Sequence, residues 1–361
     1  MIFLYLAILI LTIYKARFTP PQIQTSLSTD CTSSIKGTFI LIVFLRHLWP
    51  YMSPLMEDNY SYFDRLFITA DSMVRQLLVV MFLFYSGYGV ARSLANKGKD
   101  YLDGIPVRRI GVTLANFAVA VIGFIILGLT IGREMTLKEC LLSFSAWESV
   151  GNSNWYIFCI IICYAFTYTA FRLCHSPNHA TALLGLLCLG YIITLSHFKS
   201  QYWYDTIAAY WFGTWFAVNQ EKFGTWLERH HITVLIASLS LFGLFYTLPY
   251  RKLALADNMT AIFFALSVVL ITMRIHINNA PLRWLGKHLF PLYIYQRIPM
   301  ILFAAIGEGY LIREKAWAYV ALSICATLSI AAFYSKWAIT YSPQRHSFAK
   351  LSASLKRLYH K

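Results

Sequence analysis

Charged side chains are scarce in this chain of 361 residues. Asp, Glu, Lys and Arg make up only 13% of the sequence and hydrophobic residues 58%, whereas soluble domains carry about a quarter charged residues. A water-soluble globule would also have to bury 26 Phe, 24 Tyr and 10 Trp, more aromatic surface than one core readily takes. A bilayer removes this difficulty, because aromatic rings are favoured at its interfaces. The composition therefore predicts an integral membrane protein.

Metal-ligand spacing and nucleic-acid signatures are also lacking. The seven cysteines are scattered, mostly within apolar runs, where a cysteine behaves as a small hydrophobic residue. Cys159 and Cys163 lie four positions apart, but no His or acidic residue accompanies them at metal-ligand spacing. The formal charge of +15 is not gathered into a basic stripe interleaved with aromatics. We expect no metal site and no nucleic-acid partner.

Short polar stretches divide the apolar sequence into segments that are long enough to cross a bilayer as helices. The predicted fold is all-α, a polytopic transmembrane helical bundle with about eleven spans. These cover approximately residues 2–16, 35–52, 73–93, 110–131, 154–173, 181–197, 205–219, 232–249, 256–274, 289–309 and 316–339. The longest connections on the outer side are expected at 53–72 and 132–153.

The Lys and Arg residues predict the orientation. With the N-terminus outside, twenty of the 31 fall on the cytoplasmic side and nine on the outer side, and Arg46 and Arg297 lie within spans. The positive-inside rule therefore favours an outer N-terminus and a cytoplasmic C-terminus. Residues 1–17 are interpreted as an N-terminal transmembrane anchor, since positive charges follow their apolar run and none precedes it. Residues 341–361 form a basic cytoplasmic tail, either solvated or lying on the anionic inner leaflet.

Two basic pairs are not explained by membrane burial alone. Ionisable side chains within a span cost several kcal/mol, so they indicate function. Arg46 and His47 lie near the outer end of the second span, where His47 could act as a general base; alternatively, Arg46 snorkels to headgroups and His47 bonds a neighbouring helix. Arg108 and Arg109 lie at the cytoplasmic start of the fourth span and suit a phosphorylated ligand, although a topogenic charge pair looks the same.

Two further segments combine polar and aromatic residues. Asn154, Trp155 and Tyr156 form the outer entrance of the fifth span, which suggests either contacts to a substrate or a helix cap beside interfacial aromatics. In the tenth span, Gln296 and Arg297 follow Tyr293 in a run bounded by two prolines. A helix broken there would open onto a polar cavity; the alternative is a simple kink with Arg297 paired to an acid.

Together these features resemble the acyltransferase-3 family of membrane acyltransferases. The resemblance rests on short motifs in the same order: Lys36-Gly37 followed by aliphatics and His47, the Phe-rich Ser-Gly-Tyr stretch at 82–89, Arg108-Arg109, Trp155-Tyr156-Ile157, and the Gly-to-Tyr run at 286–295. It covers about residues 30–340 and implies a ten-helix core to which 1–17 is an addition. Many members have a His where this chain has Gln296-Arg297, and larger members have a Glu near the position of Asn154.

The resemblance implies a membrane O-acyltransferase in the cytoplasmic (inner) membrane of a bacterium. It would move an acyl group, with acetyl expected, from cytoplasmic acyl-CoA to a hydroxyl of a surface or lipid-linked saccharide. Acyl-CoA would be a co-substrate, and no tightly bound cofactor is expected. The implied roles are His47 as catalytic base; Arg108 and Arg109 for acyl-CoA; Arg46, Asn154, Trp155, Tyr156, Tyr293, Gln296 and Arg297 for the substrate pocket; and Asp64, Asp71 or Glu148 as the acidic partner of His47.

A different hypothesis is a transporter or flippase for a lipid-linked sugar. Arg46, His47 and Arg297 would then line a passage and perform no chemistry. Such proteins usually show two corresponding halves, and the sequence shows none. Binding of CoA would discriminate between the two hypotheses.

Overall fold

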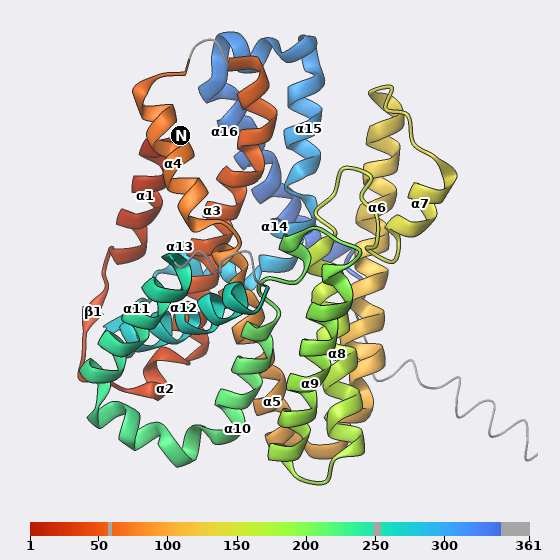
Figure 1. Cartoon of the computed structure of the whole chain (residues 1–361). Coiled ribbons are helices and arrows are strands. Elements are labelled where there is room, and N and C mark those ends of the chain that lie inside the picture. Colours follow the sequence, from red (N-terminus) through yellow and green to blue (C-terminus); the bar gives the residue numbers. More distant parts are fainter. Residues whose placement is uncertain (57–59, 248–253, 341–361) are drawn as a thin grey trace, which may run out of the picture.

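The computed structural model describes residues 1–56, 60–247 and 254–340 (Figure 1). The predicted tail, 341–361, lies outside these residues. Almost all of the described chain is helical, and its one strand pairing joins β1 (Arg17–Phe18) to β2 (Ile275–His276). The all-α prediction is confirmed.

The helices follow one another with short connections. They are α1 (Ile2–Ile13), α2 (Ile23–Ser26), α3 (Thr29–Met56), α4 (Tyr62–Val74), α5 (Leu77–Ile105), η2 (Pro106–Gly111), α6 (Val112–Thr130), α7 (Leu137–Ser143), α8 (Trp155–Leu173), α9 (Pro177–Ser196), η3 (Gln201–Trp203), α10 (Ala208–Arg229), α11 (His231–Thr247), α12 (Ala254–Arg274), α13 (Ala280–Lys287), α14 (Leu289–Tyr295), α15 (Arg297–Ala305), η5 (Ile306–Gly309), α16 (Tyr310–Phe333) and η6 (Tyr334–Lys336).

The helices confirm a polytopic membrane protein. Within the described residues, six helical stretches are long and apolar enough to cross a bilayer, or up to seven if the bent pair Gln201–Arg229 and His231–Thr247 counts as one span. The stretch Tyr62–Thr130 joins α4, α5, η2 and α6, while α1 and α14–α15 are shorter apolar helices. Each of the eleven ranges expected from the sequence contains a helix. The number of crossings stays a prediction.

Two segments that we expected as outer connections contain helices. α4 (Tyr62–Val74) begins within 53–72, and α7 lies within 132–153. Each begins with a capping box, in which the side chains of Ser61 and Asp64, or of Thr136 and Glu139, satisfy each other's backbone N–H groups. A capping box stabilises the first turn of a helix. These two connections therefore carry short helices, and their outer location stays a prediction.

The helices form two groups that meet at mid-height. In Figure 1, α3, α15 and α16 stand together in the upper part, while α5, α8, α9 and α10 form the lower part. The α15–α16 turn lies at the upper end, and the α8–α9 and α10–α11 connections lie at the lower end. Below, "upper" and "lower" refer to this view.

Glycines allow a very close helix contact between α5 and α10. A Cβ atom on Gly213 would collide with the backbone oxygen of Phe84, and one on Gly87 would collide with that of Tyr210. In a membrane, helices associate mainly through close packing, because lipid tails are as apolar as their side chains. The reciprocal glycines therefore hold the lower group together.

We predict that Gly213→Ala destabilises the protein. The added methyl group meets backbone, which cannot rotate away, so the cost should be about 2 kcal/mol or more. The measurement is the apparent unfolding temperature of the purified protein in detergent. The control is Gly243→Ala in α11, where a Cβ atom meets nothing within 4 Å and alanine favours the helix. Equal unfolding temperatures for the two variants would contradict the packing account.

Candidate active site

A cavity of about 510 Å³ opens among α3, α5, α8, α13 and α14. Its lining carries three cations, Lys36, Arg109 and Lys287, and no Asp or Glu. We call it the basic cavity. No ion pair among the described residues involves any of these three cations. A cavity with several cations and no carboxylate favours an anionic ligand.

The two lysines are placed by one helix crossing. α13 packs on α3 so closely that a Cβ atom on Gly37 would collide with the backbone of Leu282, and one on Gly286 with that of Ser33. Lys36 and Lys287 are the sequence neighbours of these two glycines, so the crossing brings both ammonium groups to the basic cavity. Packing of the backbone therefore holds two like charges close together, an arrangement that a bound anion would stabilise.

Arg108 and Arg109 are separated by the local backbone. Residues Pro106–Gly111 form a π-helix between α5 and α6, and π-helical turns are frequent at functional sites. Arg109 lines the basic cavity and its Nε donates to Tyr101 Oη at 3.0 Å. Arg108 is exposed and is not among the residues lining the cavity. Only one of the two predicted arginines thus faces this cavity.

His47 lies behind the upper wall of the basic cavity. Its ring meets that of Tyr293 edge to face with the centroids 6.1 Å apart, and Tyr293 lies 5.0 Å from Tyr156, centroid to centroid. Both tyrosines line the cavity. Three of the residues singled out in the sequence, from α3, α8 and α14, therefore come together.

Buried polar atoms without a hydrogen bond gather around this point. Among the described residues they include His47 Nδ1, Tyr293 Oη and Ser153 Oγ, together with Tyr85 Oη, whose residue lines the basic cavity. Leaving such a group unsatisfied costs about 1–3 kcal/mol, and native proteins contain few of them. The open hydroxyl of Tyr293 beside the unpaired nitrogen of His47 indicates a place where a polar ligand binds.

In the tenth span one residue, Gln296, separates α14 from α15, but its backbone keeps helical dihedral angles (φ −56°, ψ −30°), so the predicted break is at most a local interruption. α14 ends at Tyr295 and α15 begins at Arg297. Gln296 is buried, donates to the Tyr293 backbone oxygen at 3.2 Å, and faces an apolar cleft of about 180 Å³ between α1, α3, α14 and α16. Arg297 Nε donates to Tyr51 Oη at 3.0 Å, so its partner is a tyrosine and not the acid that one interpretation required.

Asn154 and Trp155 shape the entrance of α8. Asn154 is buried and its side-chain nitrogen donates to the Ala146 backbone oxygen at 3.0 Å. The Trp155 ring packs against Tyr156 and Tyr202, with centroids 6.0 and 6.1 Å apart. Both residues thus have structural contacts, and Tyr156 is the member of the trio that reaches the basic cavity.

The three carboxylates considered as partners of His47 are engaged elsewhere. Asp64 caps α4. Asp71 lies 3.7 Å from Arg46, and Glu148 lies 3.4 Å from Lys199. None of these contacts involves His47.

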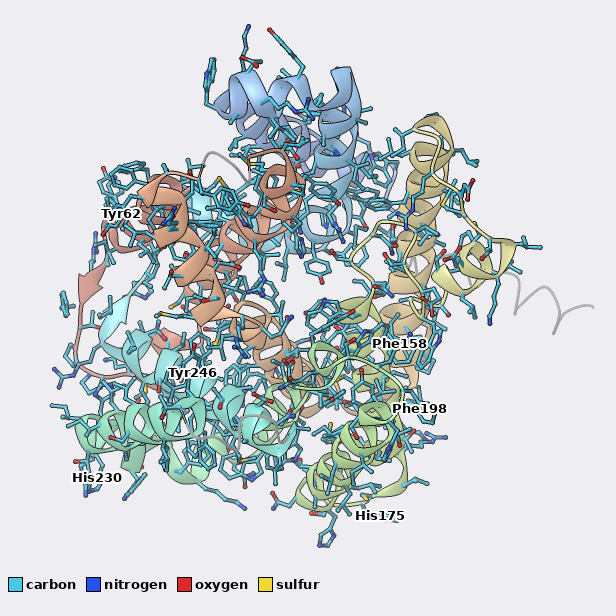
Figure 2. All side chains as sticks on the ribbon, turned by 45° about the horizontal axis from the view of Figure 1, so that its top comes forward. Tyr62, Phe158, His175, Phe198, His230 and Tyr246 are labelled. Carbon is cyan, nitrogen blue, oxygen red and sulfur yellow. The ribbon has the colours of Figure 1, made fainter. Side chains whose placement is uncertain are left out.

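A second polar pocket, of about 460 Å³, lies above the lower helices. We call it the upper pocket. Arg46, Asp71 and Asp205 line it, and so do Trp49 and Tyr202. Figure 2 labels Tyr246, another of its lining residues, on α11. Arg46 is the neighbour of His47 on α3, whereas His47 itself is in contact with Tyr293, which lines the basic cavity.

An all-helical membrane protein with a basic cavity, a second polar pocket and a buried histidine packed against the wall of the first has features that a membrane-embedded transferase needs. The family comparison agrees, since the acyltransferase-3 model, described as an acyltransferase domain, matches residues 33–336. The chain belongs to this family and is a membrane acyltransferase. No curated protein and no solved structure matches it significantly.

Sequence reasoning missed Lys36 and Lys287 as site residues. A signal for Lys36 was present. It precedes His47 by eleven residues, which is about three helical turns, so both side chains lie on one face of α3 and about 16 Å apart along its axis. No comparable signal existed for Lys287, because its position depends on the contact of α13 with α3.

We predict that Arg46 and Asp71 are coupled structurally. Arg46 also donates to the Arg75 backbone oxygen at 2.8 Å, and so fastens the junction of α4 and α5 to α3. Arg46→Gln and Asp71→Asn should each lower the unfolding temperature. The double variant should lose less stability than the two single variants lose together. The difference, the coupling energy, should be about 1 kcal/mol for this partly exposed pair. Asp71→Asn combined with His47→Ala should be additive; coupling between those two instead would restore Asp71 as the partner of His47.

Proposed function

We propose that this protein is an O-acyltransferase that moves an acyl group, with acetyl the expected group, from cytoplasmic acyl-CoA to a hydroxyl of a surface or lipid-linked saccharide. The lower end of Figure 1 faces the cytoplasm and the upper end faces outward, in the inner membrane of a bacterium. The distribution of Lys and Arg supports this orientation. The observation that carries the proposal is the basic cavity, whose wall residue Tyr293 contacts His47.

The charges of the basic cavity suit the donor. CoA carries a diphosphate and a further phosphate, and its thioester lies at the far end of a long, narrow arm. Lys36, Lys287 and Arg109 would bind the phosphates, because they are cations without an ionic partner among the described residues. The arm would extend along α3 from Lys36 toward His47, a rise of about 16 Å. Arg108, outside the cavity, would attract the donor from the surface.

The upper pocket suits a saccharide acceptor. Trp49 and Tyr202 offer aromatic rings on which a sugar face can pack, while Asp71 and Asp205 offer oxygens that accept hydrogen bonds from hydroxyl groups. Donor and acceptor would then approach His47 from opposite ends. This arrangement would allow an acyl group to cross the membrane without the donor leaving the cytoplasm.

His47 would act as the general base. Neutral imidazole accepts the proton of the acceptor hydroxyl, whose oxygen attacks the carbonyl carbon of the thioester. The C–S bond then breaks, and the sulfur of CoA leaves with the proton that the imidazole held. The ester product and CoA leave from the two ends. No step requires a metal or a redox partner.

We predict that the donor site and the base can be separated by mutation. Arg109→Ala should weaken binding of acetyl-CoA about tenfold or more, because one charged contact to phosphate is lost. His47→Ala should leave binding almost unchanged and abolish acyl transfer. Binding is measured on the purified protein, and transfer as release of CoA by membranes that contain the native acceptor.

Lys222→Met in the exposed part of α10 is the matched control, because it removes a positive charge away from both cavities. Undiminished CoA release by a well-inserted His47→Ala variant would remove the base from this scheme. If the unmodified protein has no affinity for acetyl-CoA and its deletion abolishes export of a lipid-linked sugar, the transporter hypothesis would replace the proposal.

A further inference from the structure

Tyr293 has structural features that the role of His47 as general base does not explain. It lines the basic cavity, its ring contacts both His47 and Tyr156, and its hydroxyl is buried without a hydrogen bond of normal geometry. The Ser153 hydroxyl interacts with it at the margin of hydrogen-bond geometry, and neither hydroxyl makes a full hydrogen bond to another group among the described residues. A tyrosine hydroxyl in a protein interior normally has a partner. A ligand in the basic cavity could therefore take the hydrogen bond that the Tyr293 hydroxyl lacks.

The segment that carries Ser153 is held rigidly. Asn152 Oδ1 accepts a hydrogen bond from the Val150 backbone N–H at 3.0 Å, and Ser149 Oγ donates to the Asn152 backbone oxygen at 2.7 Å. Asn154 is fixed by its bond to Ala146. Since Asn152, Ser153 and Asn154 are all buried, this wall does not relax to satisfy Tyr293. The hydroxyl is therefore preorganised.

We infer that Tyr293 is a catalytic residue that donates its hydroxyl hydrogen to the carbonyl oxygen of the thioester. This inference rests on the proposed acyl transfer. When the acceptor oxygen attacks, the C=O double bond becomes a single bond and its oxygen becomes negatively charged. The Tyr293 O–H stabilises that charge without transferring its proton. The carbonyl forms again when the C–S bond breaks, and Tyr293 is unchanged at the end of the cycle.

A preorganised donor acts mainly in the transition state, because the charge on the oxygen develops only there. Loss of one such donor lowers kcat by about 100-fold to 1000-fold in known cases. The location is consistent with this role. Tyr293 lies between the cavity that would hold the donor and the imidazole that would activate the acceptor.

The test compares Tyr293→Phe with Tyr295→Phe. Each change removes one hydroxyl and retains the ring, and Tyr295 Oη is likewise buried without a hydrogen bond on the same helix. The Tyr295 ring, however, packs against Tyr334 and Trp337 and not against His47. The probe is acetyl-CoA, and the readouts are its binding affinity, the unfolding temperature, and kcat and KM for CoA release in membranes that contain the acceptor.

Tyr293→Phe should lose about 100-fold or more in kcat while acetyl-CoA affinity, KM and unfolding temperature stay within about twofold or a degree or two of the unmodified protein. Tyr295→Phe should keep full kcat. An active Tyr293→Phe variant, in a protein that binds and consumes acetyl-CoA normally, would overturn the inference and leave the proposed function intact. If the unmodified protein neither binds nor consumes acetyl-CoA, the proposed function and the inference both fall.

Discussion

The crossing of α3 and α13 is the contact on which the site depends. Gly37 and Gly286 let the two backbones touch, and the residues beside them, Lys36 and Lys287, are thereby brought to one cavity. Side-chain contacts alone would allow two ammonium groups to move apart, whereas a backbone contact does not. The cost of holding like charges together in a bundle interior is recovered when an anion binds, so this crossing selects the ligand before any chemistry takes place.

The same helix links binding to reaction. α3 presents Lys36 toward the basic cavity and His47, three turns further along the same face, toward Tyr293. Unsatisfied polar atoms are concentrated around the histidine, whereas Arg46, Asp71 and Glu148 nearby are already paired. Buried groups that are paired stabilise the fold, and those left open are available to substrate.

Much of this organisation could be predicted from the sequence, and the exceptions have different causes. The all-α membrane fold and the meeting of His47, Tyr156 and Tyr293 follow from apolar runs and short motifs. The role of Lys287 could not be predicted, because it depends on a contact between segments about 250 residues apart. The division of Arg108 from Arg109 follows from helical geometry, since adjacent residues do not share a face, and the capping boxes that begin α4 and α7 are sequence signals that went unused.

The central claim is that donor and histidine meet through one continuous site across the membrane. The most direct measurement is an experimental structure with a non-hydrolysable acetyl-CoA analogue bound. The account predicts that the phosphates lie among Lys36, Arg109 and Lys287, and that the carbonyl group of the analogue lies against Tyr293 and beside His47. An analogue bound at the upper pocket, or one whose carbonyl lies far from His47 while its phosphates are in place, would contradict it.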